Sequence, residues 1–277
     1  MVKTYKHKFI LLIAAIMFLF ANISYSKDDK DFTAKQVMEK VDSRYDGDTS
    51  ISDMTMILID RNSKQRVRAL KNYNKDYGAD TKGIIFFLSP ADVRNTSYLS
   101  WDWDQEDKED DSWLYLPALR KVKRIASDES SGSFMGSDFS YYDINGMKIE
   151  NWDFKFIKNK EIVDGHDTWV IEGKPKVDKK RKAIKESGYL KSMAWVRNDN
   201  FMIVKAKYWV KKGKKIKYFR GKDLRKENNI WTAFEMTMVS TRQGKKEHSS
   251  VIRIDKIIYN SVIEDSMFLT QRMERGI

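Results

Sequence analysis

The side chains that could do chemistry are few, and their spacing fits no standard catalytic or metal site. Beyond residue 26 the chain has two histidines, His166 and His248, and it has no cysteine. A thiol nucleophile and thiolate metal ligands are therefore excluded. Neither histidine pairs with a second histidine at ligand spacing or with a recognisable serine, and the run GSFMG at 132–136 does not match the G-x-S-x-G motif of a serine hydrolase. We predict no catalytic residues, no metal and no cofactor.

Carboxylates are the remaining candidates for chemistry. In the acidic run 101–112, Asp102 and Asp104 have the spacing of the first two ligands of a calcium loop. The motif fails further on, because its sixth position is not glycine and its twelfth is Trp113 rather than glutamate. Other carboxylates are plentiful, but no pair is singled out for acid–base work. We expect a binding protein rather than an enzyme, and hydrolysis of a lipid or a glycan is the less favoured alternative.

The first 26 residues have the features of a secretory signal peptide. Three lysines precede an apolar run at 9–21. Ser24 and Ser26 supply the small residues that a signal peptidase recognises at its cleavage site. A membrane span needs about 20 apolar residues, so this run is short for one, and an uncleaved anchor is the alternative. We therefore predict an exported protein with a single mature domain at 27–277.

The charge balance is basic, with 52 Lys and Arg against 40 Asp and Glu. In an exported protein this balance favours anionic lipid head groups or an acidic protein partner over nucleic acid. The run 204–211 shows the charge most clearly, because it alternates an apolar face (Val204, Ala206, Tyr208, Val210) with a basic one. We predict that the basic face is either a solvated outer surface or a docking surface for a partner or membrane; its residues are Lys205, Lys207, Trp209 and Lys211.

Periodicity predicts a mainly β fold. An amphipathic helix is expected at 32–44, where Thr33 and Gln36 have capping-box spacing. From Met54 onward apolar residues recur with period two, and turn residues divide the chain into about eleven strands without helical stretches between them. A last short helix is expected at 266–274. A sheet of this size curls, so we predict a strongly curved antiparallel sheet that forms an incomplete β-barrel, lidded by the N- and C-terminal helices.

Methionine and aromatic residues are abundant, with 13 Met and 8 Trp in the chain. Flexible thioethers suit surfaces that fit variable apolar partners. Such residues could line an apolar concavity that accepts an acyl chain. They could equally fill the core between the sheet and its helices, and composition alone favours this second interpretation.

Two adjacent segments carry a family resemblance. The stretch DSWLYLPALRKVKRI at 111–125, followed by SGSFMGSDFSYYD at 131–143, resembles the LolA-like outer membrane lipoprotein-sorting proteins, relatives of the carriers LolA and LolB. The segments WVIEGKPK, WVRNDNFMIVKAKYW, IWTAFEMTMVS and DSMFLTQRMERG extend the resemblance over the mature chain. It implies a curved incomplete barrel with helices over an apolar cavity, a periplasmic location, and transport of lipoprotein or lipid acyl chains toward the outer membrane.

The resemblance also suggests a site. The Ser/Gly segment at 131–137 would form a loop at the mouth of the cavity, and apolar residues of this loop and of the strands would touch the acyl chain. These residues are Met54, Met56, Phe86, Leu114, Leu116, Phe134, Met135 and Phe139. The alternative is that they plug the barrel permanently.

Members of this branch are often linked with large transporters of the resistance-nodulation-division type. A second hypothesis follows, in which the protein is an interaction module of such a transporter and carries no lipid. Fully packed contacts at Met54, Met56, Phe86 and Leu114 would favour the module, whereas an open cavity lined by them would favour the carrier.

Overall fold

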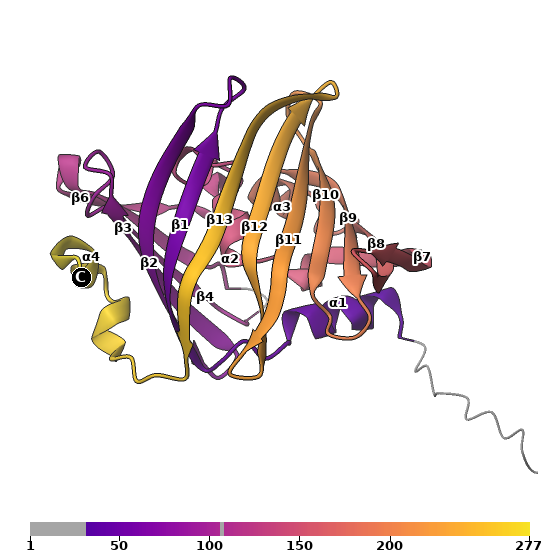
Figure 1. Cartoon of the computed structure of the whole chain (residues 1–277), viewed down its shortest axis with the longest axis horizontal. Helices are drawn as coiled ribbons and strands as arrows, with labels where there is room; N and C mark the ends of the chain where they lie inside the picture. Colours follow the sequence, from indigo (N-terminus) through magenta and orange to yellow (C-terminus); the bar gives the residue numbers. More distant parts are fainter. Residues whose placement is uncertain (1–31, 106–107) are drawn as a thin grey trace, which may run out of the picture. The chain divides into compact units, whose positions relative to one another are not determined.

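The computed structural model describes residues 32–105 and 108–277, so the predicted signal peptide lies outside the described residues. In this part of the chain, thirteen strands form one antiparallel sheet (Figure 1). The strands are β1 (Thr49–Ile59), β2 (Gln65–Tyr77), β3 (Asp80–Ser89), β4 (Ser97–Asp102), β5 (Asp111–Leu116), β6 (Lys121–Ile125), β7 (Trp152–Val163), β8 (His166–Pro175), β9 (Tyr189–Arg197), β10 (Ile203–Val210), β11 (Lys215–Glu227), β12 (Ile230–Arg242) and β13 (Lys245–Tyr259). The helices are α1 (Ala34–Asp42), α2 (Tyr141–Asn145), α3 (Lys180–Ser187) and α4 (Thr270–Arg275). None of these helices is long and apolar enough to cross a membrane.

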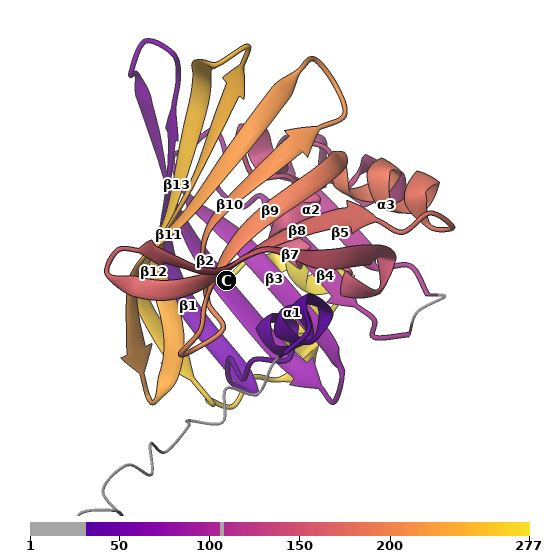
Figure 2. The same cartoon turned by 90° about the vertical axis from the view of Figure 1, so that its right-hand side faces the viewer.

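The strand order leaves the sheet open. It runs β6-β5-β4-β3-β2-β1-β13-β12-β11-β10-β9-β8-β7, so the two edge strands, β6 and β7, follow one another in the sequence. Their connection, residues 126–151, contains α2 and lies within the curve of the sheet (Figure 2). The predicted fold class, a curved open antiparallel sheet with helices, is confirmed.

Alternation along β3 separates two apolar layers. Ile85 and Phe87 point to the concave face, where they join the core that contains Phe134. Ile84 and Phe86 point to the outer face and pack with the C-terminal segment. Every one of the four is at most 8% exposed, as expected for a strand buried on both faces.

The C-terminal helix covers the outer face rather than the cavity. Phe268 and Met273, from the short 3-10 turn Asp265–Phe268 and from α4, pack against β3 and β4. The Met273 carbonyl accepts a hydrogen bond from Ser97 (3.1 Å) and the Phe268 carbonyl accepts one from Trp101 (3.0 Å). The sequence could not assign α4 to one face, because both faces of β3 are apolar and either could have been covered by it.

The N-terminal helix matches its prediction. Thr33 caps α1, since its hydroxyl accepts from the Gln36 backbone amide while the Gln36 side chain accepts from the Thr33 amide. The helix packs mainly against β7 and buries Val37 and Met38. Thus α1 covers one side of the concave face.

Three elements differ from the sequence prediction. Strands β2 and β4 were not predicted, and the basic stretch 174–187, where no helix was expected between the strands, contains α3. In β2 the polar residues pair across the sheet, as Lys71 does with Asp53 (2.6 Å), so the strand lacks an apolar alternation. Helix α3 buries Ala183 and Ser187 among a majority of charged residues, which hides its helical pattern.

Candidate functional site

An apolar cavity of about 440 Å³ lies on the concave face. Helix α1 and the connection between the edge strands cover it, and strands β7–β13 form its wall. Side chains from α1 and the connection include Met38, Val41, Phe139, Tyr142, Ile144, Met147 and Ile149. Side chains from the sheet include Phe154, Ile171, Ala194, Ile203, Tyr208, Phe219, Met236, Met238 and Ile252.

Small residues on neighbouring strands create the space. Gly173 of β8 and Ser192 and Ala194 of β9 point into the cavity, where larger side chains would fill it. A Cβ atom at Gly173 would lie 2.5 Å from the Ser192 hydroxyl and 3.1 Å from the Phe154 ring. Ser192 and Phe154 therefore already fill the space beside Gly173, and the cavity wall at this patch consists of small residues.

A buried ion pair contributes to the polar part of the wall through Asp143, which lines the cavity together with Asp42. The Lys217 ammonium lies 3.2 Å from Oδ2 of Asp143, and both side chains are about nine-tenths buried. The Tyr189 hydroxyl donates to the same carboxylate at 2.7 Å, and the Ser140 amide donates to it at 2.8 Å. The charges of this pair compensate each other, as a buried pair requires.

A smaller polar pocket adjoins the cavity. Tyr142 and Gly146 line both, and the segment that follows them separates the two. Met147 and Ile149 point into the apolar cavity, whereas Lys148 and Glu150 line the polar pocket. This pocket also contains residues of β5 and β6 and of α3, so it lies beside the edge strand β6.

Asp102 belongs to an ion-pair network and not to a metal loop. Asp102 and Asp110 both bind the ammonium of Lys148, at 2.8 Å for Asp110. Burial and the Asp110 charge raise the pKa of Asp102 to about 7 despite the opposing effect of Lys148. Within 32–105 and 108–277 no group of three or more His, Asp or Glu could hold a metal ion. His166 and His248 are both exposed.

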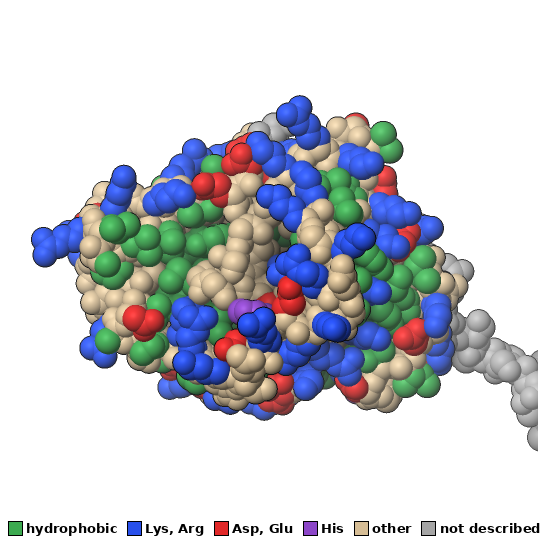
Figure 3. Space-filling view, turned by 90° about the horizontal axis from the view of Figure 1, so that it is seen from above, with side chains coloured by type: hydrophobic (Ala, Val, Ile, Leu, Met, Phe, Trp, Pro, Cys, Tyr) green, Lys and Arg blue, Asp and Glu red, His purple; other side chains and the backbone are tan. Residues whose placement is uncertain are grey.

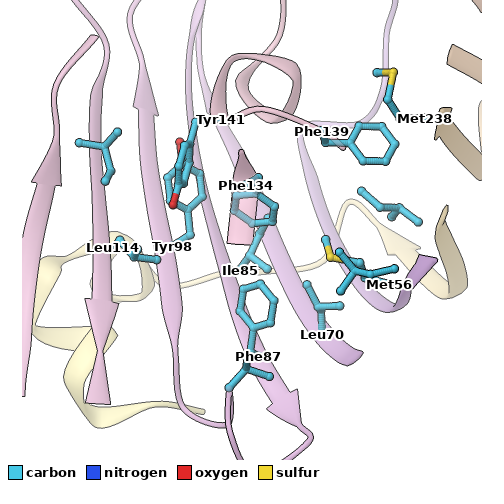
Figure 4. Close-up of a cluster of buried hydrophobic side chains, with 14 residues drawn as sticks. Met56, Leu70, Ile85, Phe87, Tyr98, Leu114, Phe134, Phe139, Tyr141 and Met238 are labelled. Atoms are coloured by element: carbon cyan, nitrogen blue, oxygen red, sulfur yellow. The ribbon is translucent and has the colours of Figure 1, made fainter. Parts of the chain in front are cut away.

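The predicted site residues come together, but most of them form packed core. Seven belong to one cluster on the concave face: Met54, Met56, Leu114, Leu116, Phe134, Met135 and Phe139. Among them Phe139 lines the cavity. Phe134 is 0% exposed, and Figure 4 shows its ring among Ile85, Tyr98 and Tyr141. Phe86, predicted to line the cavity, lies on the outer face beneath the C-terminal segment.

The Ser/Gly segment is anchored rather than loosely attached. Phe134 and Phe139 are joined by a backbone hydrogen bond of 2.8 Å. Asp138 is buried and accepts from the Ser250 hydroxyl of β13 at 2.8 Å. Arg68 of β2, also buried, donates from Nη1 to the Met135 carbonyl at 2.6 Å. Two distant strands thus hold the segment in place.

Replacing Arg68 by methionine should loosen this segment. The Met135 carbonyl would lose its donor, and an unsatisfied buried acceptor costs about 1–3 kcal/mol. We expect faster amide hydrogen exchange at residues 134–139 and a lower free energy of unfolding. Arg66→Met, an exposed position on the same strand, is the control and should change neither. Unaltered exchange in the Arg68 variant would show that this bond does not hold the segment.

The basic residues of β10 lie on the outer face of the sheet. Lys205 lies over the Trp195 ring at 4.1 Å, and Lys207 lies over Trp209 at 4.6 Å. Lys211 is exposed at the end of the strand. In the described part of the chain none of the three lysines has a carboxylate within ion-pair distance. Lys and Arg side chains are also frequent around the hollowed end of the sheet in Figure 3.

A β-bulge changes the orientation of one residue in this strand. The register with β9 shifts between Ile203 and Lys205. Ile203 therefore lines the cavity, whereas Val204 packs with Val170 and Trp195 on the outer face. The prediction that Val204 shares a face with Ala206 and Tyr208 is wrong for this reason.

The comparisons with known proteins agree with the fold. A family model described as "-like: Uncharacterized protein" matches residues 79–275, and the chain belongs to that family. A domain assigned to the outer membrane lipoprotein-sorting proteins, from Vibrio parahaemolyticus, is 28% identical with a TM-score of 0.77, over 87% of this chain and 98% of that one. A DUF1329 family protein from Desulfovibrio piger is 29% identical with a TM-score of 0.77, over 87% of this chain and 97% of that one.

A more distant structure supports the fold alone. A LolA superfamily protein from Nitrosomonas europaea is 17% identical with a TM-score of 0.64, over 87% of this chain and 99% of that one. No curated protein matches the chain. The chain is thus similar to a solved outer membrane lipoprotein-sorting domain, in agreement with the resemblance of residues 111–143.

Proposed function

We propose that the protein is a periplasmic, non-enzymatic carrier that holds an acyl chain of a lipoprotein or lipid in the concave cavity. The observation that carries the proposal is the apolar cavity of about 440 Å³ next to a polar pocket beside the edge strand β6. The relatives' description as lipoprotein-sorting proteins supports it. Export would depend on cleavage of the signal peptide at 1–26.

The size of the cavity suits one acyl chain. Ligand pockets range over about 300–1,000 Å³. If a methylene takes about the space of a liquid water molecule, about 30 Å³, the cavity has room for at least about 15 methylenes. Each buried methylene contributes about 0.8 kcal/mol. The cost of ordering the acyl chain offsets part of this gain. We therefore expect a dissociation constant in the micromolar range or below.

The polar pocket gives the acyl chain a direction. With the apolar tail among residues such as Ile171 and Met236, the polar end of the lipid would leave the cavity past Tyr142 and Gly146. A Cβ atom at Gly146 would meet nothing within 4 Å, so no side chain narrows the space at this glycine. The head group or the lipoprotein would then remain outside, beside β6.

Direct titration tests the proposal. The mature chain, residues 27–277, is titrated with a palmitoyl lipopeptide and with the same peptide lacking the acyl group, and binding is followed by calorimetry. We expect saturable binding of the acylated peptide at one per chain and none of the other. Equal binding of both peptides, or of neither, would contradict the carrier.

We also propose that the outer face of β10 docks on an anionic membrane surface. On the same face Glu172 is matched by Lys155, Lys174 and Lys191 at 3.0–3.3 Å, which leaves Lys205 and Lys207 to act on a partner. Each lysine near an anionic surface contributes about 1 kcal/mol, so Lys205→Glu/Lys207→Glu should weaken binding to phosphatidylglycerol vesicles by at least about 30-fold. Trp209 beside them suits the interface.

Two controls distinguish binding through the β10 surface from an effect of the protein's net charge alone. Lys245→Glu/Lys246→Glu makes the same change at the exposed start of β13 and should have a much smaller effect. Binding of the parent protein should also weaken as salt rises. If the vesicle affinity changes neither in the β10 variant nor with rising salt, the docking surface is contradicted.

The second candidate is an interaction module of a resistance-nodulation-division type transporter. The packed contacts of Met56 and Leu114 favour it, because the residues predicted to line the cavity are largely core. A protein that binds no acylated peptide but whose β10 face binds an acidic periplasmic domain would support this candidate over the carrier.

A further inference from the structure

One tyrosine in the cavity wall differs from its neighbours. Among the described residues no side chain or backbone group forms a hydrogen bond with the hydroxyl of Tyr208, although the side chain lines the cavity. The hydroxyls of Tyr142 and Tyr189, which line the same cavity, are bonded to Trp152 and Asp143. Tyr208 is partly exposed and faces the cavity, so its hydroxyl is free to form a hydrogen bond with a ligand there.

The ring of Tyr208 is held rigidly. It stacks on Tyr189 with the ring centroids 4.6 Å apart and the planes at 20°. Burial, together with the Asp143 charge, raises the pKa of Tyr208 well above its usual range. The hydroxyl therefore keeps its proton and can donate it to an acceptor on a ligand.

The charges beside Tyr208 are already balanced. Asp143 lines the cavity, and its carboxylate is paired with Lys217 at 3.2 Å. The pair therefore has no spare positive charge for a second anion. An ionised carboxyl group of a ligand would face the Asp143 charge in a site that screens charges poorly. An uncharged carbonyl oxygen needs a donor alone, and Tyr208 supplies one.

We propose that this wall selects acyl chains in ester or amide linkage and disfavours free fatty acids. The Tyr208 hydroxyl donates to the carbonyl oxygen of the linkage, and the Asp143 carboxylate repels a free carboxylate. The ligand class is thus glycerolipids and lipopeptides. This inference rests on the proposed function, because it assigns the polar contact of the same cavity.

Two probes of equal chain length test the selection. Monopalmitoyl glycerol and palmitate are titrated at pH 8, where palmitate is ionised, below their aggregation limits. The parent protein should bind the ester more tightly. Tyr208→Phe should weaken ester binding by about threefold to tenfold and leave palmitate nearly unchanged. Tyr218→Phe, on the outer face of β11, is the matched control and should alter neither.

A charge change tests the second half of the inference. Asp143→Asn keeps the shape of the side chain and leaves Lys217 without its anion, so palmitate affinity should rise by about tenfold while ester affinity changes little. Circular dichroism verifies that the variant folds. Binding of both probes with equal affinity in all variants would overturn this inference, but it would not contradict the proposed carrier function. Failure of the parent protein to bind either probe would instead overturn the proposed function.

Discussion

Replacing Phe134 by alanine is expected to lower the free energy of unfolding by about 3–5 kcal/mol. The ring is fully buried and contacts three others, with centroid distances of 6.0 Å to Phe87, 5.3 Å to Tyr98 and 5.5 Å to Tyr141. Its removal leaves a cavity that this packed aromatic cluster cannot collapse to fill. Urea unfolding, followed by tryptophan fluorescence, measures the change.

Leu119→Ala is the control for this prediction. Leu119 is 67% exposed, so its truncation should change the free energy of unfolding by at most about 0.5 kcal/mol. A loss below about 1 kcal/mol for Phe134→Ala would mean that Phe134 belongs to a mobile mouth loop, as the sequence suggested, and not to the core. For the same reason a charged residue at this position would report on folding and not on lipid binding.

Replacing Ala194 by phenylalanine is expected to weaken binding of an acylated peptide by roughly 50-fold. Ala194 lines the cavity on the patch of small residues, so the new ring would occupy space that the ligand uses. If the ring displaces about three methylenes at about 0.8 kcal/mol each, the loss is about 2.4 kcal/mol. The ring enters existing space, so the protein should remain folded and its Tm should not fall.

Met193→Phe provides the matched control. Met193 precedes Ala194 on β9 and packs on the outer face with residues such as Trp195. The same new ring on that face should leave acyl binding within about twofold of the parent. Equal losses in the two variants, or full binding by Ala194→Phe, would show that the cavity does not hold the acyl chain.

Much of the fold could be predicted from the sequence, because local signals there agree with the tertiary structure. Thr33 and Gln36 form the expected capping box. The apolar run of β3 is buried on both faces, and the turn residues before β8 and β11 divide strands as expected. β2 was missed because its polar residues pair across the sheet, so the strand has no apolar alternation to reveal it.

The candidate site could be predicted less well, for two physical reasons. The wall of the cavity includes small side chains, such as those of Ser192 and Ala194, and an absence of bulk has no distinctive pattern in one sequence. The Ser/Gly segment near Phe134 suggested a loop at the mouth of the cavity, but Arg68 and Ser250, distant in sequence, anchor that segment in the core. Only the folded chain brings these residues together.

The most direct measurement of the central claim is native mass spectrometry of the protein purified from a Gram-negative periplasm under mild conditions. We expect one acyl-bearing species per chain, released on denaturation and much reduced in Ala194→Phe. Protein that carries no lipid, and that also fails to bind added acylated peptide, would contradict the carrier.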